Sequence, residues 1–412
     1  MKIIRTLEQS IIEAFNLDKI IILYGPRQVG KTTLARDILQ KYKDKKILEI
    51  SADEKRFRDI LSSQDSIKLK ELIGDSNIIF IDEAQRVPDI GINLKIMHDQ
   101  IPNLKIIVTG SSSFDLANKT KEPLTGRNIS FKLYPLALCE LKNHFSKIDL
   151  ESMLDNILIY GLYPDIFNQQ NLEYKYKNLK ELTQSYIYKD ILNLESIKNI
   201  NKIEDLLQLL AFQVGSEVSM SELATQLSMN KATVEKYISI LEQAFIVFRL
   251  SGYSKNLRKE VTKMDKIYFY DNGIRNVLIN NFNNLKQRDD VGKLWENFLI
   301  SERKKYIDYT NLRANGYFWR TYTNVEIDYI EEKEQKLLPL FRQNALPQIP
   351  ISYARVSNLY YIALKIFSYC VQNYHTGKKR SHAVGHDAKN NVKRFNRHRR
   401  AVVVFKKFYH LL

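Results

Sequence analysis

Short apolar runs alternate with helical patterns over residues 1–134. Five runs have the length and apolar character of buried strands: Lys19–Tyr24, Lys46–Ser51, Asn77–Asp82, Lys105–Thr109 and Ile129–Leu133. Helical spacing lies between them, notably over Lys31–Tyr42 and Ile92–Gln100. Because strands that alternate with helices form βαβ units around a parallel sheet, the pattern predicts an α/β fold for this part of the chain.

After residue 134 the pattern changes. It is almost wholly helical up to residue 214, and the longest helical stretch is Tyr174–Ile197. Two short helices and strands follow, and then an amphipathic helix and a β-hairpin. We therefore divide the chain into five parts: residues 1–134, 135–214, 215–275, 276–340 and 341–412.

The composition is that of a folded protein. Hydrophobic residues make up 44% of the 412 residues and aromatic residues 11%, which exceeds what a disordered chain carries. No apolar run approaches the ~20 residues of a membrane span, and the N-terminus lacks the apolar stretch of a secretory signal. The two cysteines are too few for a disulfide framework. These observations predict a cytoplasmic protein with no membrane partner.

A glycine-rich segment follows the first predicted strand. Gly25–Thr32 has two glycines five positions apart followed by Lys and Thr, which is the pattern of a P-loop. In such a loop, backbone N–H groups and a helix N-terminus face the phosphates, the lysine reaches them, and the threonine hydroxyl binds Mg²⁺. A purely structural turn is the alternative. The predicted ATP-binding residues are Gly25, Pro26, Arg27, Gln28, Val29, Gly30, Lys31, Thr32 and Thr33.

A second apolar strand ends in two acids. The run Asn77–Asp82 is apolar up to Asp82, and Glu83 follows it. In P-loop enzymes the first acid of such a pair supports Mg²⁺, and the second polarises the attacking water. We therefore predict that Thr32 and Asp82 hold the metal and that Glu83 is the catalytic base. A solvated strand edge is the alternative.

Two further positions are candidates for the ATP site. The run Lys105–Thr109 is followed by a glycine and three serines, so Ser111 or Ser112 is a candidate contact to the γ-phosphate. A loop that caps the next helix is an equally good interpretation. An arginine in an ATP site stabilises charge in the transition state. Arg127 is the first candidate for that role and Arg86 the second, and a plain surface arginine is the alternative for each.

The motifs together resemble those of a known family. It comprises bacterial and archaeal AAA-type ATP-binding proteins with a C-terminal domain of unknown function, and the resemblance covers roughly residues 1–340. It rests on Gly25–Thr32, Phe80–Gln85, Thr109–Ser112, Leu124–Arg127, Tyr134–Leu136, Gly161–Pro164, Lys266–Gly273, Gly292–Phe298, Phe318–Arg320 and Glu326–Asp328. The resemblance implies a P-loop NTPase sheet, a helical lid, a winged-helix region and a C-terminal domain like the restriction-endonuclease fold.

The winged-helix region has support of its own in the residues. Ser219 and Asn230 are placed to cap two successive helices. The core shared by the helices is predicted to consist of Leu223, Leu227, Val234, Ile238 and Leu241. Such a unit can place its second helix in a DNA groove, but here the lysines of that helix are offset by glutamates. A protein-contact or scaffold role is an equally good interpretation.

A nuclease site is incomplete in the C-terminal part. Sites of that fold need clustered carboxylates and a lysine, and Glu296, Glu326 and Asp328 supply the carboxylates. The resemblance places an acid-x-Lys sequence just after Pro339, where this chain has Leu340–Arg342 instead. Nuclease activity is therefore disfavoured, and the last strand of this truncated or degenerate α/β domain is expected to be missing.

The C-terminal tail has an unusual charge. Residues 337–412 contain 14 Lys/Arg and a single acid, Asp387, and so carry +13 of the total net charge of +16. Acidic residues become rare near Leu340, and the resemblance to the family ends at about the same residue. We therefore hypothesise that the tail is an out-of-frame or replaced C-terminus. The alternative is a basic arm, Lys378–Arg400, that binds nucleic acid.

The sequence thus predicts an ATP-binding protein that uses Mg²⁺, either an AAA-type ATPase or an ATP-operated switch. The alternative from another class is a nucleic-acid-binding regulatory module in which ATP controls occupancy. A DNA or protein partner is compatible with both. The oligomeric state stays open.

Overall fold

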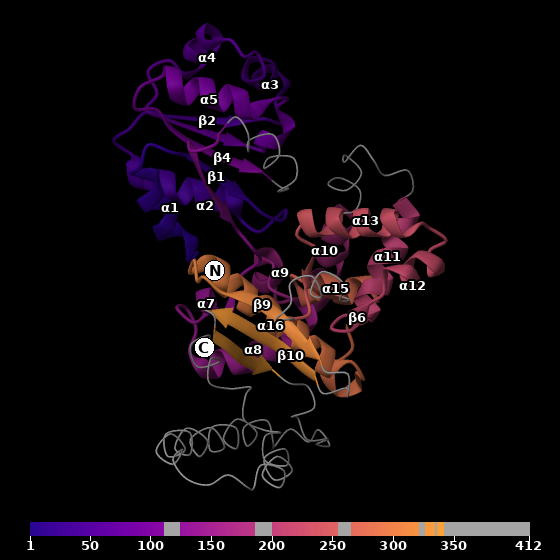
Figure 1. The fold of residues 1–412 in the computed structure, drawn as a ribbon. Helices are drawn as coiled ribbons and strands as arrows, with labels where there is room; N and C mark the ends of the chain where they lie inside the picture. Colours follow the sequence, from indigo (N-terminus) through magenta and orange to yellow (C-terminus); the bar gives the residue numbers. More distant parts are fainter. Residues whose placement is uncertain (111–123, 186–199, 254–264, 321–325, 334–335, 342–412) are drawn as a thin grey trace, which may run out of the picture.

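A parallel sheet forms the centre of the first third of the chain in the computed structural model (Figure 1). The structure describes residues 1–110, 124–185, 200–253, 265–320, 326–333 and 336–341. The five strands of the sheet run in the order β2-β3-β4-β1-β5, and all neighbours are parallel. Their bounds are β1 Ile20–Tyr24, β2 Ile47–Ser51, β3 Ile78–Asp82, β4 Lys105–Gly110 and β5 Asn128–Lys132. The predicted α/β fold is confirmed.

Helices cover both faces of this sheet. They are α1 Leu7–Phe15, α2 Lys31–Leu39, η1 Gln40–Tyr42, α3 Lys55–Leu61, α4 Ser66–Ile73, η2 Ala84–Arg86 and α5 Ile90–Gln100. Side chains alternate along β1, so Ile21 and Leu23 pack with α1 and α2, whereas Ile20 and Ile22 pack with α4 and α5. Burial on both faces explains why the strands are continuous apolar runs.

The middle of the chain is helical and then mixed. Its helices are α7 Leu138–Leu141, α8 Lys147–Tyr160, α9 Pro164–Asn168, α10 Leu172–Ser185, α11 Ile200–Phe212, α12 Met220–Gln226 and α13 Lys231–Gln243. An antiparallel sheet of order β6-β8-β7 accompanies them, with strands Glu217–Val218, Val247–Leu250 and Asp265–Phe269 for β6, β7 and β8. The predicted caps Ser219 and Asn230 accept N–H bonds at the starts of α12 and α13. The five residues predicted to form the shared core are all buried.

The C-terminal part places one long helix against a small sheet. It contains α15 Asn272–Leu278, η4 Leu285–Gln287 and α16 Val291–Tyr309, followed by β9 Asn315–Arg320, β10 Glu326–Lys333 and β11 Lys336–Phe341. The three strands form an antiparallel sheet of order β11-β10-β9. β11 pairs with β10 up to Phe341, and the expectation that a strand after it is missing concerns residues outside the described part of the chain. Both proposals for the basic tail concern residues 342–412, which lie outside the described residues.

Buried polar contacts attach α16 to the segment that follows β5. The Lys305 ammonium donates to the carbonyl oxygen of Leu136 at 3.1 Å, and a Glu302 carboxylate oxygen accepts the N–H of Leu138 at 2.7 Å. The hydroxyl of Tyr309 accepts the N–H of Tyr134 at 3.0 Å. Burial raises the pKa of Glu302, and the neighbouring Lys305 opposes that rise. A C-terminal helix thus docks on the segment that leaves the edge strand β5 of the N-terminal sheet.

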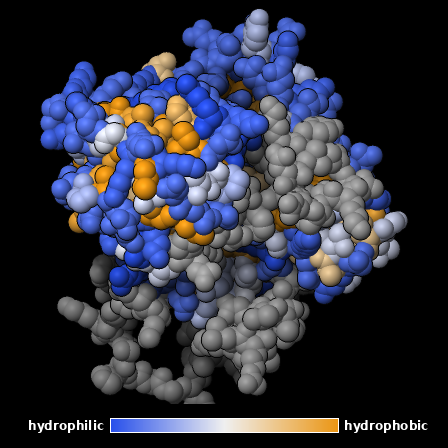
Figure 2. All heavy atoms as spheres, turned by 90° about the horizontal axis from the view of Figure 1, so that it is seen from above, coloured by the Kyte–Doolittle hydropathy of each residue, from blue (hydrophilic) through white to orange (hydrophobic). Residues whose placement is uncertain are grey.

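The surface of the α/β core is mixed in character. Figure 2 shows this end of the molecule from above, with orange apolar atoms among blue hydrophilic ones. Large apolar side chains exposed here include Ile67 of α4 and Ile92 of α5.

Replacing Gly273 by alanine is expected to destabilise the fold. An ideal Cβ on Gly273 would lie 2.2 Å from the carbonyl oxygen of Tyr160, so α15 could not keep its distance from α8. Overpacking of this kind costs about 1–3 kcal/mol. Urea denaturation of Gly273→Ala should therefore show a lower free energy of unfolding. A loss below about 0.5 kcal/mol, as at an ordinary surface site, would contradict this account.

Candidate functional site: a phosphate loop beside a hydroxyl–carboxylate cluster

The loop between β1 and α2 needs each of its glycines for a different reason. A Cβ on Gly25 would lie 2.0 Å from the carbonyl oxygen of Leu133, so only glycine lets β1 end beside the segment after β5. Gly30 has a φ of 92°, a left-handed conformation that glycine adopts without strain. The helix α2 begins at the next residue, Lys31. The loop therefore ends on a helix N-terminus, where N–H groups favour an anion.

The side chain of Lys31 lies within the loop. Its ammonium donates to the carbonyl oxygens of Gly25 at 3.0 Å and Pro26 at 2.7 Å, and the residue is only 6% exposed. Val29 is buried as well, whereas Gln28 and Thr33 are exposed. A cation is thus held within the loop that precedes the N-terminus of α2.

The carboxylate of Asp82 joins three elements. The Thr32 hydroxyl, at the start of α2, is 3.0 and 3.1 Å from its two oxygens. The Thr109 hydroxyl, on β4, also donates to it. The strand order explains this meeting, because β4 lies between β3 and β1 and parallel strands end at the same edge. A hydroxyl and a carboxylate oxygen are ligands that suit Mg²⁺, which takes its remaining ligands from phosphates and water.

The base candidate Glu83 lies at the same edge. It adopts a left-handed conformation with φ 55°, and the side-chain amide of Gln85 donates to its carboxylate. Its backbone N–H reaches the Thr109 hydroxyl at 3.3 Å. The residue after Asp82 is therefore held in position from two sides.

Thr109 is a contact that the sequence did not single out. It is fully buried, and its hydroxyl contacts both acidic residues as described above. The signal was a hydroxyl residue at the end of an apolar strand. The predicted candidates Ser111 and Ser112 lie outside the described residues.

The structure does not bring Arg127 to this site, which corrects the prediction. Arg127 precedes β5, and its carbonyl oxygen accepts the N–H of Ile20 at the start of β1. Its guanidinium pairs with Asp99 at 2.9 Å. The P-loop lies at the other end of β1, ~16 Å away for five strand residues. The second candidate, Arg86, follows β3 at the correct edge and pairs with Asp53 at 2.9 Å.

With this geometry in place, the chain can be compared with known proteins. Residues 17–142 match a family model described as an AAA domain. This part of the chain is therefore similar to AAA domains. Residues 151–285 and 291–340 match two domains of unknown function, DUF8612 and DUF4143.

Several uncharacterized proteins are similar to this chain in sequence. An uncharacterized protein of Mycobacterium tuberculosis is 28% identical over 320 residues, which covers 76% of this chain and 67% of the relative. One from Methanocaldococcus jannaschii is 25% identical over 341 residues and covers 78% and 74%. One from Haemophilus influenzae is 26% identical over 375 residues and covers 86% and 89%.

Two solved structures are partly similar to this chain. The Walker-type ATPase of Pyrococcus abyssi superposes with a TM-score of 0.46 at 16% identity, covering 66% of this chain and 94% of that protein. The RuvB branch migration motor of Thermotoga maritima gives a TM-score of 0.31 at 18% identity, covering 60% of this chain and 90% of that protein.

None of the described helices combines the length and the apolar character that a membrane span requires.

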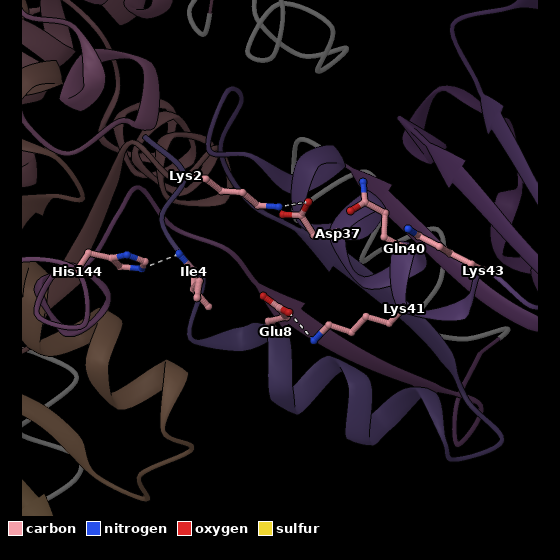
Figure 3. A pocket seen from close by; sticks show the side chains of 8 residues that line it. All are labelled: Lys2, Ile4, Glu8, Asp37, Gln40, Lys41, Lys43 and His144. Carbon is pink, nitrogen blue, oxygen red and sulfur yellow. Dashed lines mark hydrogen bonds and ion pairs between the residues drawn. The ribbon is translucent and has the colours of Figure 1, made fainter.

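A surface hollow lies outside the phosphate loop. Figure 3 shows its lining, in which Lys2 pairs with Asp37 and Lys41 with Glu8. The ring of His144 accepts the backbone N–H of Ile4. Four of its charged side chains are engaged in these two ion pairs, and it contains neither Lys31 nor Asp82, so this hollow is not our candidate site.

The three carboxylates considered for a nuclease site do meet, but around a lysine. The ammonium of Lys266, on β8, is 2.5 Å from Glu326, 3.5 Å from Asp328 and 3.6 Å from Glu296. Lys266 is 3% exposed, and the Tyr268 hydroxyl donates to Glu296 at 2.6 Å. Within the described residues, no group of three acidic, His or Cys side chains has the geometry to hold a metal.

Burial and ion pairing have opposite effects on the protonation of the groups in this cluster. Burial raises the pKa of Glu296 to about 7, although Lys266 opposes the rise. Burial alone would lower the pKa of Lys266, but the carboxylates outweigh it and the pKa is raised. The cluster therefore resembles an internal ion network between β8, α16 and β10 more than a metal site.

Replacing Lys266 by methionine should destabilise the protein, and more so at neutral than at acidic pH. Removing one partner of a buried ion network costs about 3–5 kcal/mol, because the other charges stay buried without compensation. Without Lys266 the buried Glu296 loses the charge that opposes its protonation, so its folded pKa rises further above its unfolded value. Stability is then lost as pH rises from about 4.5 through 7.

Denaturation of Lys266→Met at pH 5 and pH 7.5 checks this expectation. Lys236→Met, at an exposed position on α13, is the matched control and should change little at either pH. An equal loss at both pH values would refute the role assigned to Lys266.

Proposed function

We propose that the protein is a Mg²⁺-dependent ATPase, or an ATP-operated switch, of the AAA type. The observation that carries this proposal is the 3.0 Å approach of Thr32 to Asp82 beside a lysine that lies in the phosphate loop. A structural turn has no need of a hydroxyl, a carboxylate and a buried ammonium at one sheet edge. ATP with Mg²⁺ has the complementary charges.

Each group then has a task at a named position. The β- and γ-phosphates accept hydrogen bonds from the N–H groups of residues 28–32 and from the ammonium of Lys31. To reach them, the ammonium leaves the carbonyl oxygens of Gly25 and Pro26. Thr32 and Asp82 hold Mg²⁺, which supplies charge neutralisation when bound. Glu83 orients a water and accepts its proton as the water oxygen attacks the γ-phosphorus. The bond to the β-phosphate oxygen breaks, and ADP and phosphate leave.

The arginine role passes from Arg127 to Arg86. In its own subunit, Arg127 lies at the edge of the sheet opposite the phosphate loop, so it can meet an ATP only in a neighbouring copy. Arg86 follows Asp82 and Glu83 by a few residues, and its ion pair with Asp53 is exposed on both sides, so the side chain can exchange this partner for a bound nucleotide. We propose Arg86 as the arginine supplied by the same chain.

The described residues do not favour the alternative of a nucleic-acid-binding module. On α13 the exposed Lys231 lies 3.9 Å from Glu235, so the cationic side chain faces an acid of the same helix. A groove-binding helix needs net positive charge on the face it presents.

Two substitutions should separate ATP binding from ATP turnover. Lys31→Ala is expected to abolish both, because the mobile charge on the phosphates is lost. Glu83→Gln should keep ATP binding and lower the turnover rate about 10²–10⁴-fold, which is the contribution of a positioned base. Phosphate release and nucleotide binding by the purified full chain measure these effects.

Matched controls come from the exposed face of α4. Lys68→Ala and Glu71→Gln make the same chemical changes at exposed positions of the same domain and should leave both quantities as in the wild type. Full turnover by Glu83→Gln would remove Glu83 from the mechanism. ATP binding by Lys31→Ala at wild-type affinity would defeat the proposal itself.

A further inference from the structure

The guanidinium of Arg5 is buried directly behind the phosphate loop. One terminal nitrogen, Nη1, donates to the carbonyl oxygen of Val29 at 2.7 Å. The other, Nη2, donates to the carbonyl oxygen of Tyr134 at 2.6 Å and lies 3.3 Å from the hydroxyl of Tyr309. Nε donates to Glu140 at 2.9 Å. All three nitrogens are thus in use, on three separate segments of the chain.

The bond to Val29 fixes one peptide plane of the loop. In a trans peptide the C=O and the following N–H point in opposite directions. Because Arg5 holds the carbonyl of Val29, the N–H of Gly30 points away from Arg5. In a P-loop these N–H groups bind the phosphates. Arg5 therefore orients one of these donors, the N–H of Gly30.

The charge of Arg5 is secured inside the protein. Arg5 is 8% exposed, and its partner Glu140 is fully buried and also accepts the N–H groups of Thr6 and Ala137. Burial would lower the pKa of Arg5, but Glu140 and Tyr309 outweigh it and keep the guanidinium charged. Lysine cannot replace it, since a single ammonium does not span three segments in a planar fork.

The same guanidinium contacts the C-terminal part of the chain. Tyr309 is the last residue of α16, and its hydroxyl also accepts the N–H of Tyr134. A shift of the loop at Val29 therefore changes the position of a group on which α16 is docked. Within the described residues, Arg5 contacts the phosphate loop and α16 at the same time.

We propose that Arg5 is a positioning residue of the phosphate loop and that it couples the occupancy of this loop to the docking of α16. The inference rests on the proposed ATP site. Phosphate binding tightens the loop around its N–H groups, the carbonyl of Val29 follows, and the bonds from Arg5 to Tyr134 and Tyr309 change with it. The docking of α16, and with it the domain of unknown function that contains this helix, would thus depend on whether nucleotide is bound.

Binding of Mg²⁺-ATP by Arg5→Lys and Arg5→Met tests the positioning role. Both variants should bind ATP at least tenfold more weakly than the wild type, because the N–H of Gly30 loses its orientation. The exposed Arg56, which pairs with Glu54 in the same domain, gives the control variants Arg56→Lys and Arg56→Met. Thermal melting without nucleotide selects the variants that fold.

Hydrogen exchange of residues 302–309 tests the coupling. In the wild type, ATP should change the exchange rate of this segment at least threefold. Tyr309→Phe keeps the bond from Arg5 to Val29 but removes the hydroxyl that α16 contributes, so ATP should bind within threefold of the wild type and the exchange response should vanish. This variant remains informative if both Arg5 variants fail to fold.

The outcomes separate this inference from the proposed function. If the wild type does not bind ATP, the proposed function fails. If the wild type binds ATP, but Arg5→Lys binds it equally well or Tyr309→Phe keeps the full exchange response, the inference about Arg5 is overturned while the ATP site stands.

Discussion

One carboxylate, that of Asp82, organises the phosphate-binding edge of the sheet. It accepts hydrogen bonds from hydroxyls on α2 and β4, and so fixes where the loop after β1 meets the ends of β3 and β4. The order β3-β4-β1 places these ends together, because parallel strands all end at the same edge. Apolar runs that are buried on both faces hold this order. The chemistry proposed for the protein depends on this single meeting point, since it brings acid, hydroxyl and ammonium to the same edge.

A buried polar seam connects that edge to the rest of the molecule. Arg5 and Glu140 lie on its N-terminal side, and Glu302, Lys305 and Tyr309 of α16 lie on the other. Such a seam adds little net stability, because desolvation offsets much of the attraction between buried charges. Its effect is on geometry, since each donor accepts only a narrow range of positions for its partner. A C-terminal helix that is docked through directional bonds can follow small movements of a phosphate loop, which a purely apolar contact would absorb.

The sequence predicted the features that motifs mark, including the meeting of Thr32 with Asp82, and missed the contacts between distant segments that no motif marks. Apolar runs revealed the strands, and two glycines before Lys31 revealed the loop, because both signals lie within a few neighbouring residues. The sequence alone could have placed Arg127 away from the phosphate loop. Arg127 precedes a parallel strand and so lies at its amino end, whereas the loop follows the carboxyl end of β1. Partners such as Lys266 with Glu296, or Arg5 with Glu140, are separated by many residues and come together only through packing. A lysine at the start of an apolar strand was the one local signal for Lys266, and the pattern alone assigned it no partner.

The affinity for ATP with and without Mg²⁺ tests the central claim most directly. If the metal is held between Thr32 and Asp82, Mg²⁺ should tighten ATP binding to the wild type, and Asp82→Asn should lose most of this tightening while it still binds ATP. The change keeps the shape of the side chain and removes its charge. Calorimetric titration of the full chain measures all four affinities. ATP affinity that ignores Mg²⁺ in the wild type, or an equal Mg²⁺ effect in Asp82→Asn, would contradict the arrangement proposed for the site.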